Sequence, residues 1–137
     1  MRTITLALML SLIACGGGGG GGSSDPIDVS GRFSAIATAT DGTALAAGQS
    51  FELRFTLNQV NDTVEGTAVA SGGIGYQLSG VVSGNLIDFV ALGAPSCPGS
   101  FEGLAEVSDD SNLFVGRYAG ADCLGSLVVE FAAVREP

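Results

Sequence analysis

The chain of 137 residues contains no lysine, no histidine and no tryptophan. Without histidine there is no side chain that ordinarily titrates near neutral pH, no Ser–His nucleophile pair and no imidazole ligand for a metal. Without lysine there is no Schiff-base chemistry. An enzyme built from these residues would depend on carboxylates alone, as glycosidases do. We therefore expect no enzyme, no catalytic residue, no metal and no cofactor.

Positive charge is also scarce. Five arginines stand against fourteen acidic residues, which gives a formal net charge of −9. A protein with this net charge lacks the basic surface that binds nucleic acid or anionic lipid. We therefore expect no nucleic-acid partner, and any attachment to a membrane has to come from something other than charge.

Residues 1–14 have the features of a secretory signal peptide. Arg2 supplies the positive start, and residues 4–14 form a mostly apolar run. That run is shorter than the roughly 20 apolar residues that cross a bilayer. Leu12-Ile13-Ala14-Cys15 resembles the lipobox of bacterial lipoproteins. The resemblance implies cleavage before Cys15, a diacylglycerol on its thiol and a further acyl chain such as palmitate on the new amine. The alternative is an ordinary signal peptide with a chance cysteine.

Residues 15–30 are expected to form the lipidated cysteine and a flexible tether. Seven consecutive glycines and two serines follow Cys15, a composition typical of random-coil linkers. In many Gram-negative bacteria an aspartate after the lipidated cysteine retains a lipoprotein in the inner membrane, and Gly16 occupies that position here. The resemblance therefore implies a lipid-anchored protein of the bacterial cell envelope, on the outer membrane and facing the periplasm or the exterior.

Residues 31–135 show alternating hydrophobicity interrupted by glycine-rich turns, which is typical of an all-β domain. The connections are short, so strands adjacent in sequence should pair as an antiparallel up-and-down meander. Closure into a barrel would remove the exposed edges, and a β-sandwich is the alternative. We predict eight strands in a single domain, at residues 31–40, 50–60, 63–70, 75–83, 86–92, 100–108, 113–119 and 125–135.

Three hairpins fix the register independently. A two-residue turn at Asn61-Asp62 pairs Val60 with Thr63, and large side chains then oppose small ones on one face: Leu57 with Gly66, Phe55 with Ala68, and Leu53 with Ala70. The hairpins at 84–85 and 109–112 give the same result: Phe89 opposes Gly80, and Tyr118 opposes Gly103. A slip of one residue would expose every apolar side chain, so the agreement supports the register.

The segments VEGTAVA, LSGVVSGNLIDF and FVGRYAG resemble the avidin and lipocalin superfamily of eight-stranded (calycin-type) meander barrels. They also resemble small bacterial envelope lipoproteins of unknown role. The resemblance covers residues 31–135, rests mainly on glycine and turn spacing, and implies the shape alone. The biotin site of avidin uses tryptophans, which are absent here. Lipocalins usually carry a tryptophan after a glycine near the first strand, where this chain has Gly31-Arg32-Phe33.

Cys97 and Cys123 remain after Cys15 is lipidated. In the register of the third hairpin Cys97 lies opposite Leu124, beside Cys123. An exported protein with two such cysteines is expected to form a disulfide between them. Two buried free thiols are the alternative.

Ligand-binding candidates lie at one end of the predicted barrel. The tight turns and both termini should gather at one end, and the longer connections at the other: 41–49, 71–75, 93–99 and 120–124. A ligand would enter between the longer connections. Tyr76 and Tyr118 point inward and are the candidate ligand-binding residues. The alternative is that both are core residues with internal hydrogen bonds.

Two functions remain open. One is a barrel that binds a small apolar ligand, which needs a hollow interior although the inward-facing side chains are bulky. The other is a protein-interaction module, either an envelope assembly accessory or a barrel-type protease inhibitor. It needs an exposed apolar patch, for which the outward-facing candidates are Val81, Leu86, Val90, Leu104, Val115 and Val128. The oligomeric state is left open.

Two acidic groups are interpreted as structural. Glu102 and Glu106 share the outer face of a strand with Arg117 nearby, and we expect a solvated ion cluster there. Residues 109–112 supply too few ligands for a calcium site and are expected to form a turn.

Overall fold

The structure, a computed structural model, describes residues 27–137. The predicted signal peptide, the lipobox with Cys15 and most of the predicted tether therefore lie outside the described residues.

Eight antiparallel strands make up the fold, as the alternating pattern predicts. β7 continues to Asp122, three residues beyond its predicted end, because Gly120 and Ala121 keep pairing with Phe101 and Ser100 of β6. The strands are β1 (Gly31–Gly42), β2 (Ser50–Val60), β3 (Thr63–Ala70), β4 (Gly75–Ser83), β5 (Leu86–Gly93), β6 (Ser100–Val107), β7 (Leu113–Asp122) and β8 (Gly125–Arg135).

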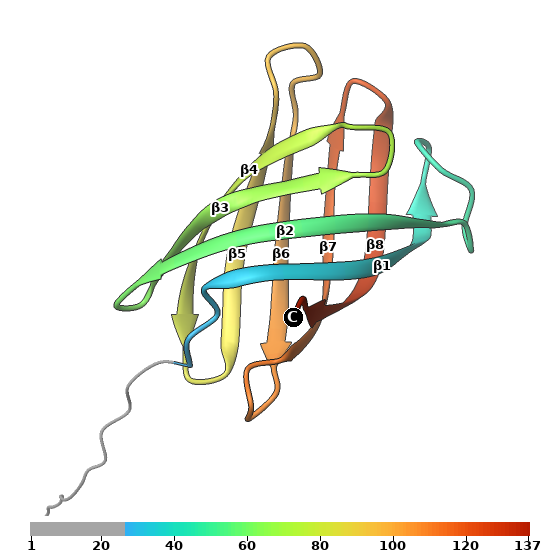
Figure 1. The fold of residues 1–137 in the computed structure, drawn as a ribbon. Coiled ribbons are helices and arrows are strands. Elements are labelled where there is room, and N and C mark those ends of the chain that lie inside the picture. The colour runs from blue at the N-terminus through green and yellow to red at the C-terminus, as the bar shows by residue number, and fades with distance from the viewer. Residues whose placement is uncertain (1–26) are drawn as a thin grey trace, which may run out of the picture.

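The sheet closes into a barrel because β1 pairs with β8 as well as with β2 (Figure 1). This rules out the alternative of a β-sandwich. The β1–β8 register shifts between Ala39 and Asp41, and an extra residue of this kind bends a strand and increases its twist. Among the described residues no helix has the length and hydrophobicity that crossing a membrane requires.

The three predicted hairpin registers are confirmed. Phe55 pairs with Ala68, Phe89 with Gly80 and Tyr118 with Gly103. The glycines allow close approach: a Cβ at Gly103 would collide with the Phe89 ring and with the backbone of β7. Small residues are therefore placed where large side chains cross the barrel.

One end of the barrel, here called the closed end, is filled by aromatic rings. Phe114 lies 4.7 Å from Phe33, 5.6 Å from Phe55 and 5.9 Å from Phe131, measured between ring centroids. The turns after β2, β4 and β6 lie at this end together with the C-terminus (Figure 1). The predicted grouping of the tight turns at one end is therefore found in the fold.

Residues 27–30 complete the closed end. Val29 is fully buried in the core, and its backbone N–H donates to Gln59 Oε1 at 2.8 Å. The sequence analysis assigned these residues to the flexible tether. In the structure the apolar side chains among them pack against the barrel core, which removes them from water. Burying a valine side chain contributes about 1.5–3 kcal/mol.

Candidate functional site

A cavity of about 340 Å³ occupies the other end of the barrel, here called the open end. It reaches from the loops after β1, β3 and β7 down to Phe55 and Phe89 inside the barrel. This is the end that the longer connections of the sequence predict as the ligand entrance. Cavities of about 300–1,000 Å³ are typical of small-molecule sites.

Small side chains form part of the cavity wall. Ala68, Ala70 and Ala91 line it, whereas phenylalanine rings meet at the closed end. Its remaining walls are mostly apolar and include Phe51, Leu53, Leu78 and Phe101. The bulky interior residues predicted from the sequence therefore leave a cavity, and several of them line it.

Both predicted tyrosines line the cavity. Tyr76, near the start of β4, donates its hydroxyl to Asp122 Oδ2 at 3.0 Å. Burial, followed by the hydrogen bond to Asp122, raises the pKa of Tyr76 to about 12. Its hydroxyl therefore stays protonated at physiological pH and acts as a hydrogen-bond donor.

Tyr118, on β7, is the more buried of the two. Burial raises the pKa of its hydroxyl, with smaller contributions from the nearby Tyr76 and Asp122. Within residues 27–137 this hydroxyl has no hydrogen-bond partner, although buried tyrosine hydroxyls usually find one. The ring of Phe101 stands edge-on between the two tyrosines, at 5.7 Å from Tyr76 and 5.4 Å from Tyr118.

Asp122 is the site residue that the sequence reasoning missed. It ends β7 and lines the cavity, and its Oδ1 accepts the Leu124 N–H at 2.8 Å. The signal that could have found it is the alternation of β7, in which Phe114 and Tyr118 face inward. The predicted strand ended at 119, so the alternation was not followed as far as Asp122.

The predicted disulfide between Cys97 and Cys123 is present at the rim of the cavity, with a Cα–Cα distance of 5.0 Å. It joins the β5–β6 loop to the turn after β7, directly beside Asp122. Cys97, Asp122 and Cys123 are the one grouping of potential metal ligands within the described part of the chain. The two sulfurs are bonded to each other, however, and metals bind the free thiolate.

The other acidic candidates lie on the surface. Glu102 and Glu106 are exposed on the outer face of β6, but the ion cluster expected around Arg117 does not form. The salt bridges of residues 27–137 instead join Glu136 to Arg32 and Arg54. Arg117 is paired across the sheet with Leu104 and Glu130, and within residues 27–137 its guanidinium is in no salt bridge.

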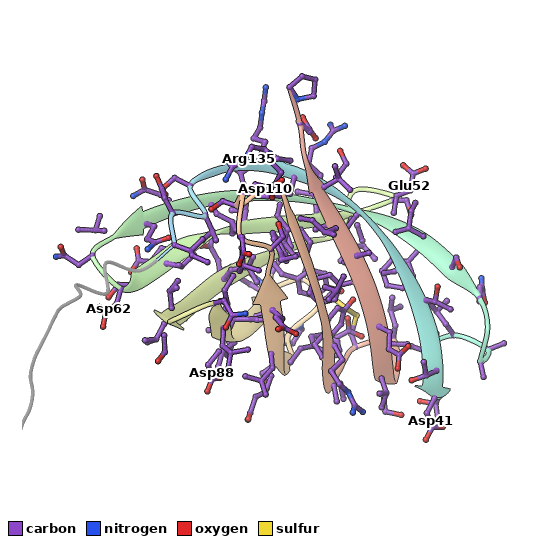
Figure 2. The ribbon with its side chains drawn as sticks, turned by 90° about the horizontal axis from the view of Figure 1, so that it is seen from below. Asp41, Glu52, Asp62, Asp88, Asp110 and Arg135 are labelled. Atoms are coloured by element: carbon purple, nitrogen blue, oxygen red, sulfur yellow. A yellow bond between two sulfur atoms is a disulfide. The ribbon has the colours of Figure 1, made fainter. Side chains whose placement is uncertain are left out.

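Residues 109–112 form the expected turn between β6 and β7. Asp110 Oδ1 accepts hydrogen bonds from the Ser108 hydroxyl at 2.7 Å and from the Asn112 N–H at 3.0 Å. These bonds within the turn hold the carboxylate and lower the pKa of Asp110. Asp110 therefore acts as a turn residue (Figure 2).

The outer surface carries the predicted apolar residues. Leu86, Leu104 and Val115 are 48%, 53% and 44% exposed on three neighbouring strands. Val81 and Val90 are also exposed, whereas Val128 is half-buried. Asp88 points away from the barrel among them (Figure 2).

No protein-family model matches the chain, and no curated protein is significantly similar to it.

Proposed function

We propose that this protein is a lipid-anchored protein of the bacterial cell envelope whose barrel binds a small, mainly apolar molecule without converting it. The observation that carries the proposal is the hollow open end, with apolar walls and a few polar groups at one side. This combination is typical of small-molecule sites, in which apolar walls supply affinity and a few polar groups fix orientation.

The proposed anchor is Cys15, which the lipobox resemblance places at the start of the mature chain. Residues 27–30 join the barrel at the closed end. A tether that starts there would leave the open end facing away from the membrane. The cavity would then be accessible to molecules in the surrounding aqueous compartment.

Filling the cavity tests the binding role. Ala91 lines the cavity and is 7% exposed, so Ala91→Leu would place a larger side chain in the space that the ligand needs. We expect it to weaken the binding of an uncharged naphthalene-type fluorophore by about tenfold or more. The added side chain takes up part of the ligand's space, and a tenfold loss of affinity corresponds to only about 1.4 kcal/mol. Fluorescence titration of the purified full chain carrying Cys15→Ser measures the affinity.

Ala132→Leu is the matched control, because Ala132 is exposed on the outer face of β8. It adds the same atoms outside the cavity and should leave the affinity unchanged. Equal affinities for the wild type and both variants, or no binding of the fluorophore to the wild type, would contradict the proposed function.

A protein-interaction module is the second candidate, and the exposed leucines and valines of β4 to β7 favour it. Such an apolar patch is typical of a contact surface. A photo-crosslinking residue at Leu104 should then give one dominant adduct in intact cells. The same residue at Thr56, which is exposed on β2, should give none. Equal, diffuse labelling from both positions would contradict this second function.

A further inference from the structure

The cavity at the open end has one charged side chain in its lining, and that charge is negative. Asp122 stands at the rim. All of the arginines in the described chain lie elsewhere. Arg32, Arg54 and Arg117 are on the outer surface, and Arg135 is at the closed end. A carboxylate or phosphate entering this cavity would meet Asp122 with no positive charge to compensate it.

Asp122 has hydrogen-bonding capacity left for a ligand. An ionised carboxylate has about four lone-pair positions. The Leu124 N–H and the Tyr76 hydroxyl occupy one position on each oxygen. An N–H donor of a ligand can therefore bind this carboxylate without displacing either contact. Hydrogen bonds to an ionised partner are roughly twice as strong as those between neutral groups.

The rings beside Asp122 also favour positive charge. Tyr76, Phe101 and Tyr118 all line the cavity, and the Phe101 ring stands roughly perpendicular to each tyrosine ring, at 86° to Tyr76 and 82° to Tyr118. Aromatic faces attract cations within about 6 Å of the ring centroid. Tyr118 adds a partly buried hydroxyl whose oxygen can accept a hydrogen bond from an ammonium group.

We propose that the ligand of this cavity is an organic ammonium cation, a protonated amine attached to an apolar body. Its N–H groups bind Asp122 beside Tyr76, Phe101 and Tyr118, and its apolar part fills the space lined by Ala68 and Ala91. This inference rests on the proposed ligand-binding function and specifies the chemical class of the ligand. The net charge of −9 also favours the approach of cations to the protein.

The test compares three probes that differ only in their head group: phenylbutylamine, phenylbutanol and phenylbutanoic acid. Each is titrated by calorimetry near neutral pH into the full chain carrying Cys15→Ser, with its disulfide formed. We expect the amine to bind about tenfold more tightly than the alcohol, since a hydrogen bond to a charged group is worth that much. The acid should bind most weakly.

Asp122→Asn keeps the shape of the side chain and removes its charge. In this variant the amine should lose its advantage while the alcohol keeps its affinity. Asp88→Asn is the matched control, because it removes one exposed negative charge from the outer face of β5. The preference for the amine should survive this change, which excludes an effect of net charge alone.

The possible failures are distinguishable. If the alcohol or the acid binds the wild type as tightly as the amine, the cavity is a binding site and the ammonium inference is wrong. If the preference for the amine persists in Asp122→Asn, the role of Asp122 is wrong. If none of the three probes binds the wild type, the proposed function fails and this inference with it. The comparison on the wild type remains decisive even if Asp122→Asn does not fold.

Discussion

The guanidinium carbon of Arg135 lies 4.7 Å from the centroid of the Phe33 ring. The same guanidinium donates to the backbone oxygens of Ser30 at 2.6 Å and Ser111 at 2.8 Å. Arg135 thus joins the segment before β1, the turn after β6 and the aromatic core. It therefore links three parts of the closed end.

Arg135→Ala should lower the free energy of unfolding by about 2–3 kcal/mol, because a cation–π contact and several charged hydrogen bonds are lost together. Arg135→Lys should recover only part of this, since an ammonium group cannot reproduce the planar fork of donors. Urea unfolding followed by circular dichroism measures both. Arg117→Ala is the control: its side chain is exposed and it should change stability by about 0.5 kcal/mol or less. Equal effects at 117 and 135 would contradict the role of Arg135.

Gly103→Ala should destabilise the barrel by about 1–3 kcal/mol through overpacking. A methyl group at this position would meet the Phe89 ring and the Arg117 carbonyl. Gly75→Ala is the matched control in another strand, because the nearest atom to its new Cβ is 4.0 Å away. Thermal melting of the two variants should separate them clearly. Similar melting temperatures would mean that the close approach at Gly103 carries no energetic weight.

The disulfide joins cysteines that are 26 residues apart in the sequence. Removing it with Cys97→Ala and Cys123→Ala should lower the free energy of unfolding by about 3 kcal/mol, because the bridge restricts a loop of that length in the unfolded chain. A reducing agent should lower the melting temperature of the wild type and leave that of the double variant unchanged. If reduction leaves the wild type unaffected, the bridge does not contribute to stability.

Stability should fall in alkaline solution because of the tyrosines. The pKa of Tyr76 rises from 10.0 to about 12 on folding. The contribution of its protonated hydroxyl to the free energy of unfolding is therefore fully present below pH 10 and is lost as the pH rises towards 12. No lysine titrates in this range, and arginine stays charged. A chain with Tyr76→Phe and Tyr118→Phe should therefore show a nearly flat dependence between pH 9 and 11, measured by urea unfolding at each pH. A matching decline in both proteins would assign the effect to other groups.

Cys15→Ser should release the protein from the membrane, because the proposed acyl chains are its anchor and each buried CH₂ contributes about 0.8 kcal/mol. Cell fractionation followed by immunoblotting measures the distribution between membrane and soluble fractions. The variant with Cys97→Ala and Cys123→Ala, which keeps Cys15, should stay with the membrane. Full retention of Cys15→Ser in the membrane fraction would contradict lipid anchoring.

The sequence by itself determined the strands and the pairing of neighbours. Large and small side chains alternate so that each hairpin fits one register, and a slip would turn the apolar face to water. The same register placed Cys97 beside Cys123 and turned Tyr76 and Tyr118 inward, as the structure confirms. These features depend only on the pairing of strands that are adjacent in the sequence, which is why the sequence was sufficient.

The tertiary structure alone decided how the barrel is closed and filled. The bond between Tyr76 and Asp122 joins residues separated by 46 positions, and Val29 packs into an end that hairpin registers do not describe. Register is set between two adjacent strands, whereas the interior at one height is shared by side chains from all eight. Phe114 packs against Phe33 and Phe55 at the closed end, whereas the largest internal space described here, about 340 Å³, lies at the open end.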